Sequence, residues 1–436
     1  MAKIKNFPMY SWCKDLFPLC RSITGKGIKD TLSYFEKINP SLKRVRFKTG
    51  KKVLDWSIPY EWHIKDAYIL SIKTKKKFAE FKKNNLHVVN FSEPVKKIIS
   101  KEDLLKKIFT TKTNKSLIPY VTSYYKKFWG FCMSEKEKKK LPKGKYKVFI
   151  DSKFTKGTLD LSHSLIKGKS RKEIFFSSYV CHPSMANNEL SGPVILNALL
   201  KYITLNYKKT NFSYRFVLLP ETIGSISYLS KFKKIMKKNM FIGFNLSCLG
   251  DSKAYSIISS PNNDCLSFKI LYSLLKKKKE LIVYDFLERG SDERQYCAPN
   301  IELPVVGYCR SKYGKYKEYH TSGDNLNLIS QKSLEDSLEV LINLVEGCET
   351  CLYPRTTTFG EPNLSKRNLY PTVSKEGTLD GKLRLRKNLL AYSDGKKTIF
   401  EISEILGENI KNVINEYKIL IKNNLIKNEK FRLSHE

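Results

Sequence analysis

From residue 173 to about residue 350, the sequence alternates short apolar runs with longer amphipathic segments. The apolar runs have the length of strands, and the first of them is EIFFSSYV (173–180). The amphipathic segments, such as LSGPVILNALLKYI (190–203), place apolar residues three or four positions apart, which is typical of helices. The other apolar runs lie at 214–220, 240–250 and 303–309. This order predicts an α/β domain with a mostly parallel sheet that is flanked by helices on both faces.

The rest of the chain divides into segments with different patterns. Residues 1–43 have helical spacing and are expected to join residues 91–353 in the α/β domain. Residues 44–90 consist of short, aromatic, alternating stretches, which predict a small β-rich insert. Residues 354–382 contain the Pro and Gly of a linker, and residues 383–436 have the helix, turn, helix and strand pattern of a winged-helix-like domain. Two further runs, YKVFIDS and TLDLSHSLI, are expected to pair as antiparallel strands.

The net charge is +38, from 80 basic and 42 acidic residues, and it raises the question of a nucleic-acid partner. The basic residues are mostly lysines in runs such as KTKKK and LLKKKKE, whereas readout of duplex DNA favours arginine forks. We therefore interpret the charge as a solvated surface and do not expect nucleic-acid binding.

No apolar run has the length that a membrane span requires, and the first residues lack the apolar core of a secretory signal. These observations predict a cytoplasmic protein. Its ten scattered cysteines are then expected to be reduced thiols, with no thiolate zinc site among them.

Groups that can bind a metal or exchange a proton come directly after the predicted strands. They are His182 with Asn188, Glu221, Asp251 and, in the loop after the last strand, His320. The carboxyl ends of the strands form the ligand crevice of an open α/β sheet, so we expect these side chains to meet there. Each has an ordinary alternative, such as a turn residue or a helix cap, but the joint pattern favours a site. The motif GSDERQY adds Asp292 and Arg294.

Several long motifs resemble those of the DUF4910 proteins, whose catalytic-type domain is similar to the M28 zinc aminopeptidases. The resemblance covers essentially the whole chain, including an insert similar to the DUF2172 region and the winged helix. It implies a zinc-exopeptidase-like fold and a link to bacterial surface-polysaccharide biosynthesis. The motifs are RSITGKG, IPYVTSYYKKFWGFC, CHPSMANNELSG, LLPETIGSISYL, GSDERQYCAP, YHTSGDN and FGEPNLSKRNLYP.

The M28 pattern, carried onto this chain, makes His182 and His320 the histidine ligands and Glu221 the general base. Asp251 is the best match for the carboxylate ligand, with Asp292 as a competing candidate. The chain departs from the pattern twice, because Asn188 stands at the bridging carboxylate and Thr222 stands at the second metal's own carboxylate.

The two neutral positions predict one zinc ion at most, because a bridging carboxylate is needed to offset repulsion between two cations about 3.5–4 Å apart. His182, Asp251 and His320 would leave a fourth position open for water, with Asn188 as a weak additional ligand. Glu221 would then activate that water against an amide bond. Arg294 and Arg21, with Asp292 and Tyr319 nearby, are the candidate substrate-binding residues, since arginine suits carboxylate or phosphate groups.

Two other functions remain open on the sequence. The loss of both carboxylates is also what a catalytically inactive binding or scaffold protein would show. A DNA-binding regulator is the third hypothesis, although the presumed recognition segment NIKNVINEYKILIKNN has lysines but no arginine. The substrate is left as a small molecule, a peptide or an amino-acid-modified glycan, and the insert and winged helix are candidate surfaces for a homo-oligomer.

Overall fold

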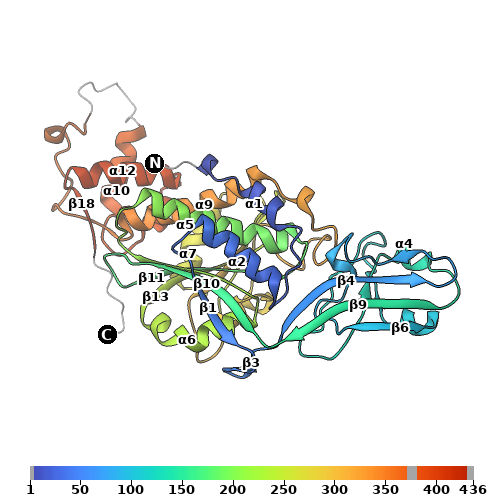
Figure 1. Cartoon of the computed structure of the whole chain (residues 1–436). Helices are drawn as coiled ribbons and strands as arrows, with labels where there is room; N and C mark the ends of the chain where they lie inside the picture. Colours follow the sequence, from blue (N-terminus) through green and yellow to red (C-terminus); the bar gives the residue numbers. More distant parts are fainter. Residues whose placement is uncertain (1–3, 371–380, 430–436) are drawn as a thin grey trace.

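The computed structural model describes residues 4–370 and 381–429, and an eight-stranded sheet lies at its centre (Figure 1). The strand order is β1-β10-β12-β11-β13-β16-β14-β15. The four middle strands β12, β11, β13 and β16 run parallel. Strands β1 and β10 pair antiparallel with their neighbours, and β14 pairs antiparallel with β16 but parallel with β15. The strands are β1 (Lys43–Lys48), β10 (Thr158–Ile166), β11 (Glu173–Tyr179), β12 (Ser213–Leu219), β13 (Met240–Leu246), β14 (Tyr255–Ile258), β15 (Leu281–Tyr284) and β16 (Val305–Cys309).

Helices cover both faces of this sheet, as predicted from the alternation of strand-length apolar runs with helical segments. In the fully buried strand β11, Ile174 and Phe176 pack in one core and Phe175 packs in another. The first core contains α5 (Ser191–Asn206) and α9 (Gln331–Cys351), and the second contains α6 (Ile223–Asn239), which lies below the sheet in Figure 1. The other helices of the first face are α1 (Met9–Leu16), α2 (Lys26–Ile38) and α7 (Leu266–Leu275). The short helix α8 is Glu293–Tyr296.

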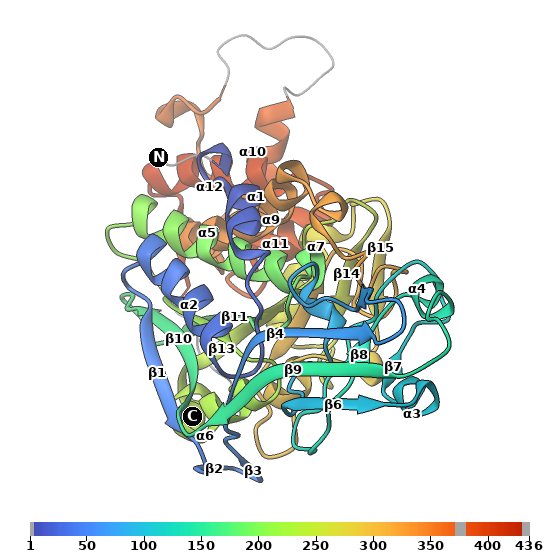
Figure 2. The same cartoon turned by 45° about the vertical axis from the view of Figure 1, so that its right-hand side comes forward.

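A second, four-stranded sheet in the order β5-β4-β9-β6 extends away from the main sheet (Figure 2). It has its own core and contains the short helices α3 (Lys101–Leu105) and α4 (Glu135–Lys139) at its far end. Its strands are β4 (Glu61–Ser71), β5 (Lys77–Phe78), β6 (Val95–Ile99) and β9 (Tyr146–Thr155). Two short strand pairs lie outside both sheets: β2 (Lys52–Val53) with β3 (Trp56–Ser57), which contacts α6, and β7 (Ile108–Phe109) with β8 (Phe131–Cys132).

This β-rich unit differs from the expected insert over residues 44–90. Residues 43–48 pair with β10 in the main sheet, and the second sheet draws its longest partner, β9, from beyond residue 90. The expected antiparallel pairing of YKVFIDS with TLDLSHSLI is wrong, because β9 pairs with β4 and β6 while β10 pairs with β1 and β12. Local alternation marks a strand but does not specify its partner.

The C-terminal unit is a winged helix formed by α10 (Gly381–Tyr392), α11 (Ile399–Ile405) and α12 (Ile410–Lys422). Its small sheet pairs β18 (Ile426–Asn428) with β17 (Pro354–Thr356), so the first part of the expected linker belongs to this unit. The ends of the expected linker and domain, at 371–380 and 430–436, lie outside the described residues.

The winged helix packs directly on the α/β domain. Helix α12 packs against α9, where Lys411 forms an ion pair with Glu339 and Lys418 lies 3.9 Å from Glu346. A search of residues 4–370 and 381–429 finds no helix with the length and apolar character needed to cross a membrane.

Candidate functional site

A cavity of about 410 Å³ lies at the carboxyl ends of β11 and β12. Four side chains predicted from the sequence line it, namely His182, Glu221, Arg294 and His320. His182 follows β11 and Glu221 follows β12, and the ends of neighbouring parallel strands meet at one edge of the sheet. Nε2 of His182 lies 3.7 Å from Oε2 of Glu221, so the two groups face each other across the cavity floor.

The imidazole of His182 is held from behind. Its Nδ1 lies 2.8 Å from Oε2 of Glu189, which is carried by a π-helical turn at Ala186–Leu190. Arg21 donates from Nε to the carbonyl of His182 at 2.9 Å and lies 3.6 Å from Glu189. A carboxylate on the outer nitrogen is the usual device that orients a ligating histidine. Nε2 is therefore the nitrogen available to the cavity.

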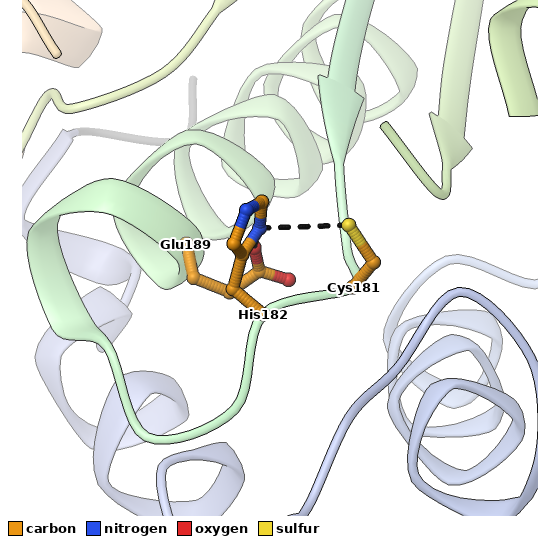
Figure 3. A group of neighbouring side chains, drawn as sticks. All are labelled: Cys181, His182 and Glu189. Atoms are coloured by element: carbon orange, nitrogen blue, oxygen red, sulfur yellow. Dashed lines mark hydrogen bonds and ion pairs between the residues drawn. The ribbon is translucent and has the colours of Figure 1, made fainter. Parts of the chain in front are cut away.

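Figure 3 shows Cys181 beside the same histidine, and ligand atoms of Cys181, His182 and Glu189 all lie within 4.8 Å of one another. The thiol is 3.5 Å from Nδ1, the nitrogen that Glu189 already engages. Burial raises the pKa of Cys181 to about 11, so the thiol stays protonated at neutral pH. We interpret Cys181 and Glu189 as residues that position the His182 ring. The Cys181 thiol is protonated and Nδ1 of His182 is engaged by Glu189, so neither is free to bind an ion.

Residues 290–294 hold the start of α6 in place. Ser291 donates to Oε1 of Glu221 at 2.7 Å, the backbone N–H of Thr222 donates to Oδ1 of Asp292 at 2.7 Å, and Arg294 donates to Oγ1 of Thr222 at 2.5 Å. Thr222 has a φ of +65°, which a β-branched residue rarely adopts. These contacts therefore fix a strained turn that directs Glu221 into the cavity.

Two carboxyl groups at this turn have perturbed pKa values. Burial raises the pKa of Glu221 above its usual range, although His182 and Ser291 oppose the shift. Burial, followed by the charge of Glu221, raises the pKa of Asp292 to about 7. Adjacent buried carboxyl groups resist ionising together, so both would gain from a cation placed in the cavity.

His320 reaches the cavity from the loop after β16. Its backbone has a φ of +52°, its ring stacks on Tyr319 at 3.9 Å, and its carbonyl accepts a hydrogen bond from the Tyr120 N–H. The ring centroids of His320 and His182 are 5.3 Å apart. Within the described part of the chain, Nε2 of His320 has no hydrogen-bond partner. Burial lowers the pKa of His320 to about 3, so the ring is neutral, which is the form that binds metals.

The structure does not bring Asp251 to this cavity. Its carboxylate accepts four hydrogen bonds, from Asn187 Nδ2, the Lys253 N–H, and the N–H and Oγ of Ser311, at 2.8 to 3.0 Å. Asp251 lies five residues beyond the end of β13, and the loop turns it into a structural role. Its position after a strand and the resemblance to the M28 pattern had placed it among the ligands, and the hydrogen bonds explain the difference.

Asn188 is also buried outside the cavity lining. Its Nδ2 donates to the Tyr179 hydroxyl at 2.7 Å and lies 3.5 Å from the Cys248 sulfur. Its Oδ1 has no partner among residues 4–370 and 381–429. The amide thus lies behind His182, beside Tyr179, whose ring centroid is 5.3 Å from that of His182.

The remaining predicted substrate residues lie one layer behind the cavity wall. Arg21 supports His182 and is fully buried, Asp292 supports Thr222, and Tyr319 supports His320. Arg294 is the only one of these four candidates that lines the cavity within the described chain.

Three further residues around the cavity were not predicted from the sequence. Glu189 orients His182, and Tyr120 places its ring 5.1 Å from that of His182 and 5.2 Å from that of His320. Asp324 accepts backbone hydrogen bonds from residues 186–188, and so ties the His320 loop to the π-helical turn. The acidic residues were visible in the motifs CHPSMANNELSG and YHTSGDN, but nothing in their spacing showed what they contact.

The side chains at the cavity fit one divalent cation better than two. Nε2 of His182 and Nε2 of His320, which has no partner among the described residues, are donors of the kind that zinc prefers, and the Glu221 oxygen not held by Ser291 faces them. Beside Thr222 the wall carries the guanidinium of Arg294. A second dication there would meet a fixed positive charge with no bridging carboxylate.

Comparisons with known proteins show the family and the fold of the chain. The model of a family described as a domain of unknown function, DUF4910, matches residues 10–350, and a winged helix-turn-helix model matches residues 351–428. A protein from Clostridium acetobutylicum is 37% identical to this chain, and the alignment covers 93% of this chain and 92% of the relative. The relative's provisional name describes a polysaccharide biosynthesis protein with an aminopeptidase-like domain.

Solved structures show the same fold. A crystal structure of a provisionally assigned peptidase from Clostridium acetobutylicum has a TM-score of 0.87 and 36% identity, covering 96% of this chain and 95% of that one. The zinc aminopeptidase BSAP from Bacillus subtilis has a TM-score of 0.57 and 13% identity, covering 78% of this chain and 93% of that one. The second likeness concerns the fold alone.

Proposed function

The chain belongs to the DUF4910 family. On that premise we propose that it is a metal-dependent hydrolase that binds one zinc ion and cleaves an amide bond. The observation that carries the proposal is the meeting of His182, His320 and Glu221 in one cavity, with Nε2 of His320 unpartnered among the described residues. His182 and His320 would hold the ion. When bound, zinc would supply Lewis acidity to the substrate carbonyl and to the attacking water.

Glu221 is the proposed general base. Ser291 holds its Oε1, which leaves Oε2 free to take a proton from water and later to return it to the departing amine. The side chain is 22% exposed, so substrate and water can reach it. Asp251, which the sequence offered as a third ligand, has no part in this proposal because its carboxylate is fully engaged.

Arg294 is the proposed anchor for an anionic group of the substrate. Its side chain lines the cavity, and one of its amino groups is fixed by the hydrogen bond to Thr222. A carboxylate or phosphate bound there would be held bidentately and would hold the scissile amide near Glu221. The name of the Clostridium acetobutylicum relative, which refers to polysaccharide biosynthesis, supports an amide in a polysaccharide component as the substrate.

A catalytically inactive binding protein is the second candidate. It is favoured by the engagement of Asp251, which leaves the two imidazoles of His182 and His320 as the proposed ligands among the described residues. Zinc-replete protein analysed for metal content separates the two, because less than about half an ion per chain would favour the inactive protein.

The Glu221→Gln variant tests the hydrolase. We expect turnover of amino-acid p-nitroanilides and aminoacylated sugars to fall by about 10²–10⁴-fold, with zinc content unchanged, because the amide keeps the shape of the side chain but cannot accept the proton. Glu102→Gln, which changes an exposed glutamate of α3, is the matched control. Full activity of Glu221→Gln would remove this residue from the mechanism.

A further inference from the structure

A second cavity of about 390 Å³ lies beside the candidate active site, and we call it the outer pocket. It is lined by aromatic residues from separate parts of the β-rich unit and by two lysines, and these are Tyr60, Phe91, Tyr125, Phe154, Lys126 and Lys127. Its volume falls in the range of small-molecule sites and exceeds the space that one amino-acid side chain needs. The proposed catalytic chemistry uses none of these residues.

The outer pocket adjoins the active-site cavity. Tyr125 lines both spaces, and Trp56, which contacts its ring, lines the inner one. Behind them, the ring of Tyr120 contacts His182, and its hydroxyl lies 3.0 Å from that of Tyr124.

The same wall continues outward from Tyr124. Its ring contacts Phe91, and Phe91 contacts Phe154, with centroids 5.4 and 5.2 Å apart. One aromatic wall therefore runs from the proposed metal ligand to the outer pocket, and it places that pocket next to the proposed reaction site.

The chemistry of the outer pocket combines exposed ring faces with unpaired charge. Tyr60 is 48% exposed and Tyr125 is 51% exposed, so their faces are open to a ligand. Lys126 and Lys127 are exposed, and neither ammonium group forms an ion pair within the described chain. Glu93 also lines the pocket and can accept hydrogen bonds from hydroxyl groups.

We propose that the outer pocket binds an acidic sugar, a pyranose ring that carries a carboxylate, as the non-scissile part of the amide substrate. The proposal rests on the proposed function for the position of the amide. The C–H face of a pyranose packs on flat aromatic rings, its hydroxyls match Glu93 and the tyrosine hydroxyls, and its carboxylate matches Lys126 and Lys127. An apolar peptide side chain would gain nothing from the two lysines.

Binding of simple glycosides to the full-length protein tests this inference. Methyl β-D-glucuronide, methyl β-D-glucoside and N-acetylphenylalanine amide are titrated separately and followed by ligand-observed NMR. We expect the glucuronide to bind best. Tyr60→Ala should weaken both glycosides about tenfold because it removes a stacking face. Lys126→Ala should weaken the glucuronide about threefold and leave the neutral glucoside unchanged.

Two exposed residues elsewhere serve as controls, and Tyr392→Ala and Lys96→Ala should leave glycoside binding unchanged. Absence of glycoside binding, or binding that Tyr60→Ala does not weaken, would overturn the inference. Binding of only N-acetylphenylalanine amide would assign the pocket to an apolar peptide side chain instead. The titrations are repeated with the Glu221→Gln variant, so that glycoside binding is measured without turnover. Failure of the hydrolase proposal can then be distinguished from failure of the glycoside-binding proposal.

Discussion

The Asn188→Asp variant probes the position where this chain has an amide in place of a bridging carboxylate. The side chain is 1% exposed, and its Nδ2 donates to the Tyr179 hydroxyl, while its Oδ1 has no partner among the described residues. A carboxylate there could accept from the Tyr179 hydroxyl, but its second oxygen would stay unsatisfied. Glu189 and Asp324 also lie close by and add like charge. We therefore expect the introduced carboxyl group to have a raised pKa in the folded protein.

The size of the effect follows from that shift. A rise of about 2 to 3 units from the ordinary aspartate pKa, at about 1.4 kcal/mol per unit, lowers the free energy of unfolding by about 3–4 kcal/mol at pH 7.5. A carboxyl group whose folded pKa is raised contributes stability below its unfolded pKa and loses it as pH rises through the folded pKa. The deficit relative to wild type should therefore shrink below about 1 kcal/mol at pH 4.

The assay is guanidinium denaturation followed by tryptophan fluorescence, at both pH values and with or without zinc. At pH 7.5, zinc at a hundred times its dissociation constant should recover about 2.7 kcal/mol if the new carboxylate binds it. Asn262→Asp, at an exposed turn, is the control and should behave like wild type. A deficit under about 0.5 kcal/mol that does not change with pH would refute the reasoning, because it would mean that water reaches this side chain.

Two further predictions separate structural from functional positions. Asp251→Asn should lower the free energy of unfolding by about 2–3 kcal/mol, since an amide cannot accept all four hydrogen bonds. The zinc content of this variant should be unchanged, and a loss of zinc in metal analysis would restore Asp251 as a ligand. Lys411→Ala and Lys418→Ala should leave the affinity for duplex DNA and its salt dependence unchanged, because these side chains face α9. A drop of about one in the slope of log K against log salt concentration would show that α12 contacts phosphate.

The sequence alone identified the strand ends that carry the candidate site. Apolar runs of strand length followed by helical spacing place His182 and Glu221 at one edge, because parallel strands that alternate with helices must align their carboxyl ends. The structure brings these two residues together with His320 and Arg294, all four of which were predicted. The α/β fold with its winged helix is likewise confirmed by the comparisons.

Only the tertiary structure decided which polar residues face the cavity and which strands pair. Asp251 and Glu189 are both acidic residues in the segments that follow strands, five residues past β13 and ten past β11. One is saturated by hydrogen bonds and the other orients His182. Likewise, β9 and β10 are adjacent in sequence but lie in different sheets. Periodicity along the chain reports which side of an element is buried. Contacts between distant residues depend on how loops turn and on which partner satisfies each hydrogen bond, and one-dimensional spacing does not contain that information.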